Sequence, residues 1–181
     1  TKRPERMRTY LLNSMRLEDI YAVWHGTSGG PPEAQAWPLP NVWLGVSVED
    51  QATADERIPL LLQTPAAVRF VSYEPALGPV DFRWGGMSMP DYAPHRPLPQ
   101  LDWVIVGGES GPKARLFDVE WARSAITQCN ADGIACFVKQ LGARPVNSSV
   151  AGHNTGISLM DRAGADPSEW PEDLRVQEFP K

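Results

Sequence analysis

Four short runs of apolar residues, separated by helix-like or breaker-rich stretches, constrain the fold of this chain most strongly. The runs are residues 42–48, 68–74, 103–107 and 134–138. Their nearly continuous apolar character is typical of strands that are covered on both faces. Parallel strands need a crossover between them, so strands that alternate with helices predict an α/β fold with a parallel sheet.

Helices are expected over residues 1–15, 53–62 and 118–132. Asp50 or Thr53 is a suitable N-cap for the second helix, and we expect Pro59 to shorten or kink it. Asp118 is the expected N-cap of the third helix, and Gly133 is expected to end it.

Four parallel strands with apolar sequences would leave two bare sheet edges, whereas a closed (β/α)₈ barrel has none. We therefore expect residues 1–145 to form a partial, half TIM-type barrel of about four strands, with a strand ending just before Thr1. The alternative is a small open parallel sheet, which would need an extra strand from the loops or the tail; the sequence offers no clear candidate. Residues 75–100, rich in Pro and Gly but carrying Trp84, Met87 and Tyr92, are expected to form an ordered insertion. Residues 146–181 are expected to be a C-terminal loop and tail that pack on the barrel.

Composition excludes several classes of protein. The net charge of -5 provides no overall basic field, which argues against a nucleic-acid-binding role. We expect a cytoplasmic protein, phage-encoded or from a bacterial host, because no apolar stretch is long enough to cross a membrane. Two cysteines, Cys129 and Cys136, and three scattered histidines match no familiar metal-site spacing, so we predict no metal site and interpret both cysteines as core residues.

Polar residues follow each predicted strand. In parallel α/β folds, functional groups gather at the carboxyl ends of strands, so side chains from several strand ends are expected to meet. The candidate catalytic residues, suited to acid/base work, are Glu74, Glu109 and Lys139. The candidate cofactor-binding residues are Lys2, Ser47, Glu49, Gly107, Gly108, Ser110 and Gln140. A single strand-end charge is often only a solvated loop residue, but four coincident polar ends favour a site. The glycine-rich run 107–111 matches neither the Walker loop nor the dinucleotide fingerprint.

Five segments, taken together, resemble a phage-associated family of unknown function. They are TKRPERM at 1–7, NVWLGVSVE at 41–49, SYEPALGPVD at 72–81, WVIVGGESG at 103–111 and WPEDLRV at 170–176. The resemblance covers nearly the whole chain. Members of that family typically carry, upstream of the matching region, a three-cysteine motif of the radical-SAM kind, and some are encoded beside a partner protein named for that motif.

The resemblance implies that an N-terminal half, or a three-Cys-motif partner protein, supplies a [4Fe–4S] cluster and most of an S-adenosylmethionine site. This chain would then be the wall on the substrate and cofactor side. It has no cysteine triplet, so we expect it to hold no cofactor of its own and to be inactive alone. Whether the chain is part of an enzyme stays open at this stage. Two alternatives also stay open: a phage accessory module that captures a protein through residues 75–100, and a nucleic-acid-associated protein. The substrate, the reaction and the oligomeric state are not specified by the sequence.

Overall fold

The computed structural model describes residues 1–12, 38–82, 101–149 and 155–181. The end of the expected first helix, the three histidines and most of the expected insertion, including Trp84, Met87 and Tyr92, lie outside these ranges.

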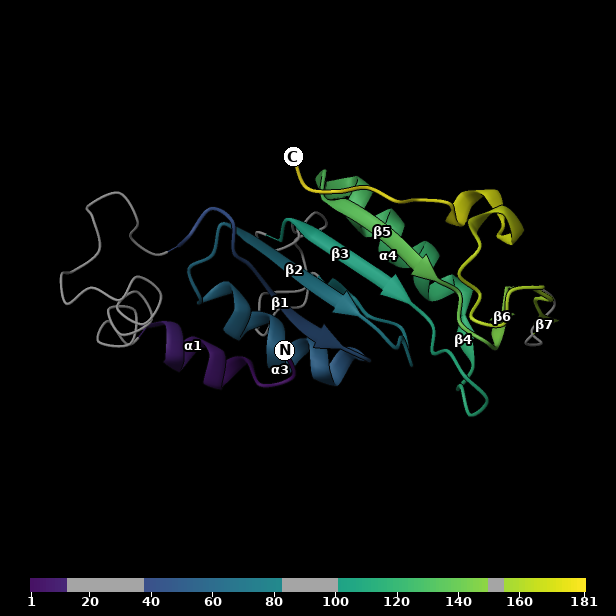
Figure 1. The fold of residues 1–181 in the computed structure, drawn as a ribbon, viewed down its shortest axis with the longest axis horizontal. Coiled ribbons are helices and arrows are strands. Elements are labelled where there is room, and N and C mark those ends of the chain that lie inside the picture. The colour runs from purple at the N-terminus through teal and green to yellow at the C-terminus, as the bar shows by residue number, and fades with distance from the viewer. Residues whose placement is uncertain (13–37, 83–100, 150–154) are drawn as a thin grey trace, which may run out of the picture.

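The centre of the fold is a four-stranded parallel sheet. Its strands are β1 (Trp43–Val48), β2 (Val68–Tyr73), β3 (Trp103–Gly107) and β5 (Ala135–Gln140). They lie side by side in the order in which they occur in the chain, and each neighbouring pair is parallel (Figure 1). The predicted α/β class with about four parallel strands is confirmed, and the sheet is open rather than closed into a barrel.

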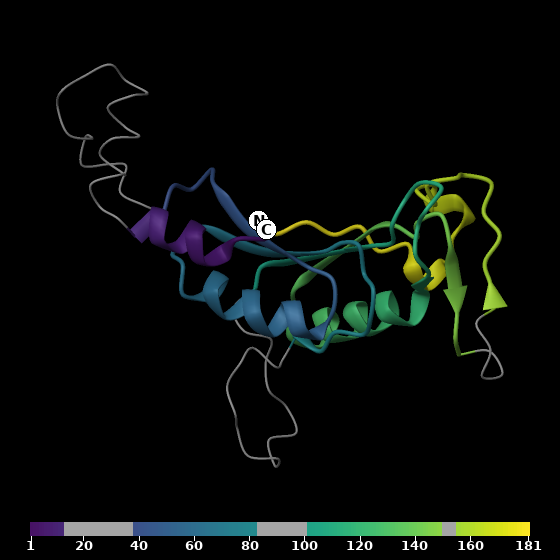
Figure 2. The same ribbon diagram turned by 90° about the horizontal axis from the view of Figure 1, so that it is seen from below.

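The helices lie on one face of this sheet. They are α1 (Pro4–Leu12), α3 (Gln51–Leu62) and α4 (Val119–Asp132). Helix α3 packs on β1, and α4 packs on β3 and β5, while α1 packs against α3 (Figure 2). Alternate strand residues face the two long helices and are fully buried: Val46, Val48, Val71, Tyr73, Val104, Val106, Cys136 and Val138. In the described part of the chain, no helix has both the length and the apolar character needed to cross a bilayer.

Local sequence explains where the two long helices begin and end. Asp50 is the N-cap of α3 and forms a capping box with Thr53, so the helix begins at the residue after Asp50, slightly earlier than expected. Asp118 is the N-cap of α4 and accepts a hydrogen bond from the backbone N–H of Glu120. Gly133 ends α4 in the left-handed conformation, with φ of 68°. The predicted cap and end of α4 are therefore confirmed.

Pro59 lies inside α3 and does not shorten it, because the helix continues to Leu62. A proline removes only its own backbone donor, and the Pro59 carbonyl still accepts a hydrogen bond from the N–H of Gln63.

Several short elements near the C-terminus were not predicted. Strands β4 (Phe117–Asp118), β6 (Pro145–Asn147) and β7 (Thr155–Gly156) form a small second sheet, and η2 (Pro167–Glu169) and η3 (Glu172–Leu174) are single 3₁₀ turns. Elements of two or three residues are too short to display a hydrophobic period, so the sequence carries no signal for them.

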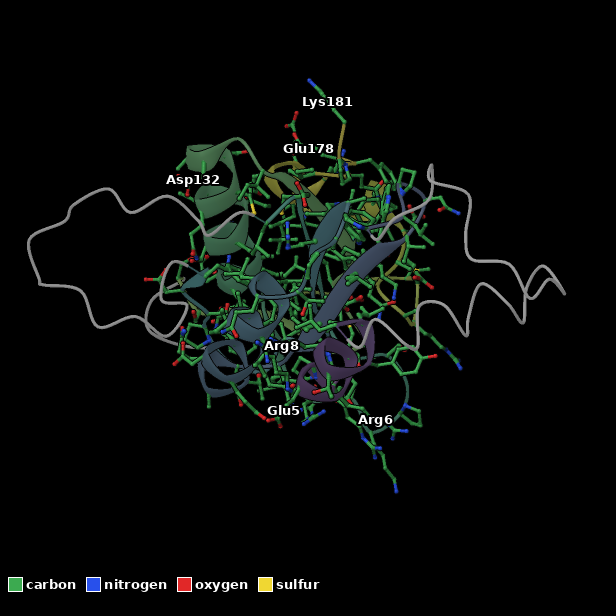
Figure 3. The ribbon with its side chains drawn as sticks, turned by 90° about the vertical axis from the view of Figure 1, so that its left-hand side faces the viewer. Glu5, Arg6, Arg8, Asp132, Glu178 and Lys181 are labelled. Carbon is green, nitrogen blue, oxygen red and sulfur yellow. The ribbon has the colours of Figure 1, made fainter. Side chains whose placement is uncertain are left out.

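The C-terminal tail pairs with the outer edge of β5 through an isolated bridge and adds no strand to the sheet. The backbone N–H of Val138 donates to the carbonyl of Val176 at 2.8 Å, and the N–H of Glu178 donates to the carbonyl of Cys136 at 2.9 Å. Gln177 forms an antiparallel bridge with Phe137 between these bonds. Figure 3, which views the end of the sheet where the strands begin, shows Glu178 on this tail segment. The tail therefore occupies the edge through which a barrel would close.

The sheet face opposite the helices carries a cluster of aromatic rings. Trp103 is at its centre, with ring centroids 5.2 to 6.0 Å from those of Trp43, Phe70, Phe137 and Phe179. No helix of the described residues covers this face (Figure 2). The side chains of Trp43 and Phe179 are 43% and 60% exposed. Alternating strand residues are therefore directed outward on a face that no described helix covers.

The anchoring of the tail can be tested at Trp170. Its ring is 2% exposed, and its Nε1–H donates to the carbonyl of Gly164 at 3.0 Å. We expect Trp170→Ala to lower the free energy of unfolding by about 3–5 kcal/mol, because it removes a large buried ring. Met160→Ala in the same segment, where the side chain is 90% exposed, should change it by less than about 0.5 kcal/mol. Urea denaturation measures both values, and equal losses would show that the tail is not held by its buried ring.

Candidate functional site

A cleft of about 230 Å³ lies at the carboxyl ends of β2, β3 and β5. Its lining residues are Glu74, Pro75, Gly108, Glu109, Lys139 and Gln140, and we call it the strand-end cleft. Five of these six residues were predicted as site residues from their position after apolar runs. The structure brings them together because the carboxyl ends of neighbouring parallel strands lie at the same edge of the sheet.

An ion pair between Glu74 and Lys139 spans the strand-end cleft. The Lys139 ammonium lies 3.2 Å from Oε1 of Glu74 and 3.4 Å from Oε2. The two side chains differ in exposure, at 17% for Glu74 and 55% for Lys139. The hydroxyl of Ser72 also donates to Oε2 of Glu74, at 3.3 Å. Glu74 is therefore a largely buried carboxylate with two side-chain partners, and Lys139 is the more exposed member of the ion pair.

Gly107 leaves the space that the Glu74 carboxylate occupies. A Cβ atom on Gly107 would lie 2.8 Å from Oε1 of Glu74, which is closer than a carbon and an oxygen can approach without a shift. The pairing of β3 with β5 also changes register here, so that Gly107 lies beside Gln140. Gln140 in turn donates from Nε2 to the carbonyl of Gly108 at 2.8 Å. The predicted binding residues Gly107, Gly108 and Gln140 thus shape the cleft through their backbone and through contacts with one another.

Glu109 is bound by an arginine that the sequence analysis missed. Arg115 donates to both carboxylate oxygens of Glu109, from Nε at 2.9 Å and Nη2 at 3.0 Å, and its backbone N–H donates at 3.0 Å. The side-chain and backbone hydrogen bonds from Arg115 lower the pKa of Glu109 to about 2. Glu109 therefore stays ionised at neutral pH and is a poor proton donor there. It fixes the 109–115 loop beside the cleft.

The predicted residues at the end of β1 form a separate charged cluster. Glu49 is only 7% exposed and forms ion pairs with Lys2 and with Arg57, whose Nη1 lies 2.9 Å from Oε2. The same Nη1 of Arg57 donates to the carbonyl of Ser47 at 2.7 Å. Removing one partner of a buried ion pair lowers the stability of a protein by about 3–5 kcal/mol. The contacts of Glu49 therefore connect β1 to α3 through Arg57 and to the N-terminal segment through Lys2.

Ser110 and the two cysteines do not line the strand-end cleft. Ser110 is exposed on the loop after β3 and is not among the lining residues. Cys129 and Cys136 are buried between α4 and β5, as expected of core residues. A hydrogen bond between the two thiols, together with burial, raises the pKa of Cys129 far above its ordinary value. The thiol of Cys129 therefore stays protonated at neutral pH.

The described ranges offer no place for a metal ion among their acidic, His and Cys side chains. They contain no group of three or more His, Cys, Asp or Glu side chains placed to hold a metal ion. The described residues therefore do not fit an iron–sulfur cluster.

The sequence contained a signal for only one of the missed residues. Ser72 lies two positions before Glu74 in a strand, and a period of two places both on the same face. Arg115 and Arg57 are brought to their carboxylates by a loop and by a helix turn, respectively, and no periodic pattern indicates either contact.

The contribution of the Glu109–Arg115 pair to stability is expected to depend on pH. Arg115→Gln should return the pKa of Glu109 toward its ordinary value of 4.5, as measured by carboxyl-carbon NMR titration. Because the folded-state pKa is lowered, the stability that this pair contributes is present above about pH 4.5 and is lost as the pH falls toward 2. The difference in unfolding free energy between the native chain and the variant should narrow over that range. The matched control is Lys113→Gln, in the same loop, which should leave the titration of Glu109 unchanged; a shift as large as that of Arg115→Gln would contradict the assignment.

Comparison with known proteins places the chain in a family but identifies no activity. No significant match was found among curated proteins or among solved structures. The model of a family described as a protein of unknown function, DUF5131, matches residues 1–167. This match covers most of the chain, including every residue of the strand-end cleft. The chain belongs to the DUF5131 family of proteins of unknown function.

Proposed function

We propose that this chain is the ligand-side wall of a larger parallel α/β barrel-type protein, and that its strand-end cleft binds the amino-acid moiety of a small zwitterionic ligand. The observation that carries the proposal is the Glu74–Lys139 pair, which lines a cleft at the ends of three neighbouring parallel strands. The consecutive strand order, with the helices on one face, supports the proposal that the chain is one wall of a barrel.

The energetics of the two strand-end clusters favour Glu74 over Glu49 as the ligand-binding carboxylate. Lys139 is more than half exposed, so water can replace Glu74 as its partner and a ligand can separate the two side chains at small cost. Opening the buried Glu49 cluster would cost several times more. The carboxylate of Glu74 can accept hydrogen bonds from a ligand ammonium, and Lys139 can donate to a ligand carboxylate.

The size of the cleft supports a site that is completed by other parts of a larger protein. At about 230 Å³ it is smaller than the roughly 300–1,000 Å³ of typical small-molecule sites. It has room for an amino-acid moiety but not for an attached nucleoside. S-adenosylmethionine, the cofactor that the family resemblance implies, carries both, and the donor and acceptor set of the cleft suits its amino-acid end. In this proposal the residues of the chain bind and orient the ligand, and the remaining groups come from an N-terminal half or from a three-Cys-motif partner.

Binding can be measured by NMR on the ¹⁵N-labelled chain titrated with methionine and with S-adenosylmethionine. We expect shifts at the amides of Gly107, Gly108 and Gln140. Glu74→Gln and Lys139→Met should each raise the dissociation constant about tenfold or more, because each removes a charge-assisted hydrogen bond.

The matched control is Lys113→Met, which removes an exposed lysine outside the cleft lining and should leave both titrations unchanged. Shifts confined to other parts of the chain would refute the proposal. Equal affinities for the native chain and for the Glu74→Gln, Lys139→Met and Lys113→Met variants would refute it as well. Shifts with S-adenosylmethionine but not with methionine would mean that the nucleoside, rather than the amino-acid moiety, is recognised.

A further inference from the structure

Part of the lining of the strand-end cleft belongs to a stack of three backbone segments. The first contains Glu109, the second is the segment around Gly142 that follows β5, and the third is a turn of the C-terminal tail at residues 161–164, which we call the tail turn (Figure 1). The backbone N–H of Ala143 donates to the carbonyl of Glu109 at 2.9 Å and joins the first two segments. The N–H of Leu141 donates to the carbonyl of Gly164 at 2.8 Å and joins the second segment to the tail turn.

Two glycines allow these three segments to approach one another closely. Gly142 has φ of 77°, and a Cβ atom on it would lie 2.7 Å from the carbonyl oxygen of Glu109. Gly164 has φ of 63°, and a Cβ atom on it would overlap the carbonyl oxygen of Gly142. Both positions therefore favour glycine through the backbone conformation and through the lack of space. Because the contacts are backbone against backbone, no flexible side chain lies between the segments to absorb a shift of one of them.

The tail turn is held in place by Trp170. The ring of Trp170 is 2% exposed, and its Nε1–H donates to the carbonyl of Gly164 at 3.0 Å. The same carbonyl accepts the hydrogen bond from Leu141, so one oxygen joins the buried ring to the segment after β5. Within the tail turn, the N–H of Gly164 donates to the carbonyl of Asp161 at 3.0 Å.

Gln140 connects the same stack to the lining of the cleft. It directly precedes Leu141 and directly follows Lys139, the cation of the cleft. The carbonyl of Gln140 accepts from the N–H of Gly108 at 3.0 Å, and its Nε2 donates to the carbonyl of Gly108 at 2.8 Å. The bond between Leu141 and the tail turn therefore acts on a residue that contacts the lining through both its backbone and its side chain.

We propose that the C-terminal tail positions the strand-end cleft, and that Gly164 is the positioning residue through which the tail acts. Displacement of the tail turn moves the segment around Gly142 and, with it, the backbone of Gly108 and Glu109. This deepens the proposed function by naming what regulates the site, and it rests on that function only where ligand binding is the readout. Because coupling between two sites is reciprocal, a ligand in the cleft also strengthens the contacts of the tail turn.

The coupling can be tested with Gly164→Ala in the ¹⁵N-labelled full chain. The added Cβ atom displaces the backbone of Gly142, so we expect the amide signals of Gly108 and Glu109 to shift. We also expect the dissociation constant for methionine to rise about tenfold, which corresponds to the loss of about one hydrogen bond. Trp170→Phe is the milder variant, because it keeps a ring in the core and removes only the donor to Gly164. It should shift the same two signals and raise the dissociation constant about threefold.

Two controls separate positioning of the cleft from loss of stability. Gly156→Ala in β7 adds a Cβ atom that meets nothing within 4 Å, so it should change neither the two amide signals nor the affinity. Leu61→Ala removes a buried side chain of α3 that does not line the cleft, so it should destabilise the chain without changing either readout in the folded protein. Urea denaturation identifies the conditions under which each variant is folded.

Unchanged Gly108 and Glu109 signals in Gly164→Ala would overturn the proposal, and so would equal effects of Leu61→Ala. If Gly164→Ala does not fold, Trp170→Phe decides in the same way. Saturating methionine should also slow amide exchange of Leu141 about threefold in the native chain, and an unchanged rate would contradict the coupling. If the native chain does not bind methionine, the proposed function fails, and the two amide signals still decide whether the tail positions the cleft.

Discussion

The parallel pairing of four consecutive strands, with every described helix that packs on them lying on one face, is the constraint on which the rest of the structure depends. Consecutive order places the carboxyl ends of β2, β3 and β5 side by side, so polar residues from distant parts of the chain meet in one cleft. One-sided helix packing leaves the other face uncovered, with aromatic rings toward the start of the strands and the Glu74–Lys139 pair toward their end. These two features are the basis of the proposal that the chain is one wall of a larger barrel.

Charged residues at the strand ends have two different physical roles. Glu49 is nearly buried and joins β1 to α3 and to the N-terminal segment through Arg57 and Lys2, so loss of Arg57 would leave a buried charge uncompensated. Glu74 is fixed by Ser72, and its partner Lys139 is more than half exposed. A pair of this kind contributes little to stability and remains available to a ligand. The two carboxylates differ in that Glu49 also pairs with Arg57, which is 14% exposed, whereas Glu74 pairs only with the 55% exposed Lys139 among the ion pairs of the described residues.

Much of the sheet and part of the site follow from local patterns in the sequence. Apolar runs predicted the four strands, and Asp118 and Gly133 predicted the limits of α4. The position of polar residues after the runs predicted Glu74, Lys139 and Gln140 as candidate site residues. Contacts between segments that have no shared period could not be predicted. The tail pairs with β5 through a bridge at Gln177, and Glu109 forms an ion pair with Arg115 from an irregular loop. The same limit applies to Ser47 and Glu49 near the end of β1, because no sequence pattern predicted their contacts with Arg57.

The central claim is that the Glu74–Lys139 pair opens to receive an amino-acid moiety. A crystal structure of the chain bound to S-adenosylmethionine tests it most directly. We expect the ammonium of the ligand within hydrogen-bond distance of Glu74, its carboxylate beside Lys139, and the nucleoside extending out of the cleft over the uncovered face of the sheet. A ligand bound elsewhere, with the Glu74–Lys139 ion pair still intact, would contradict it.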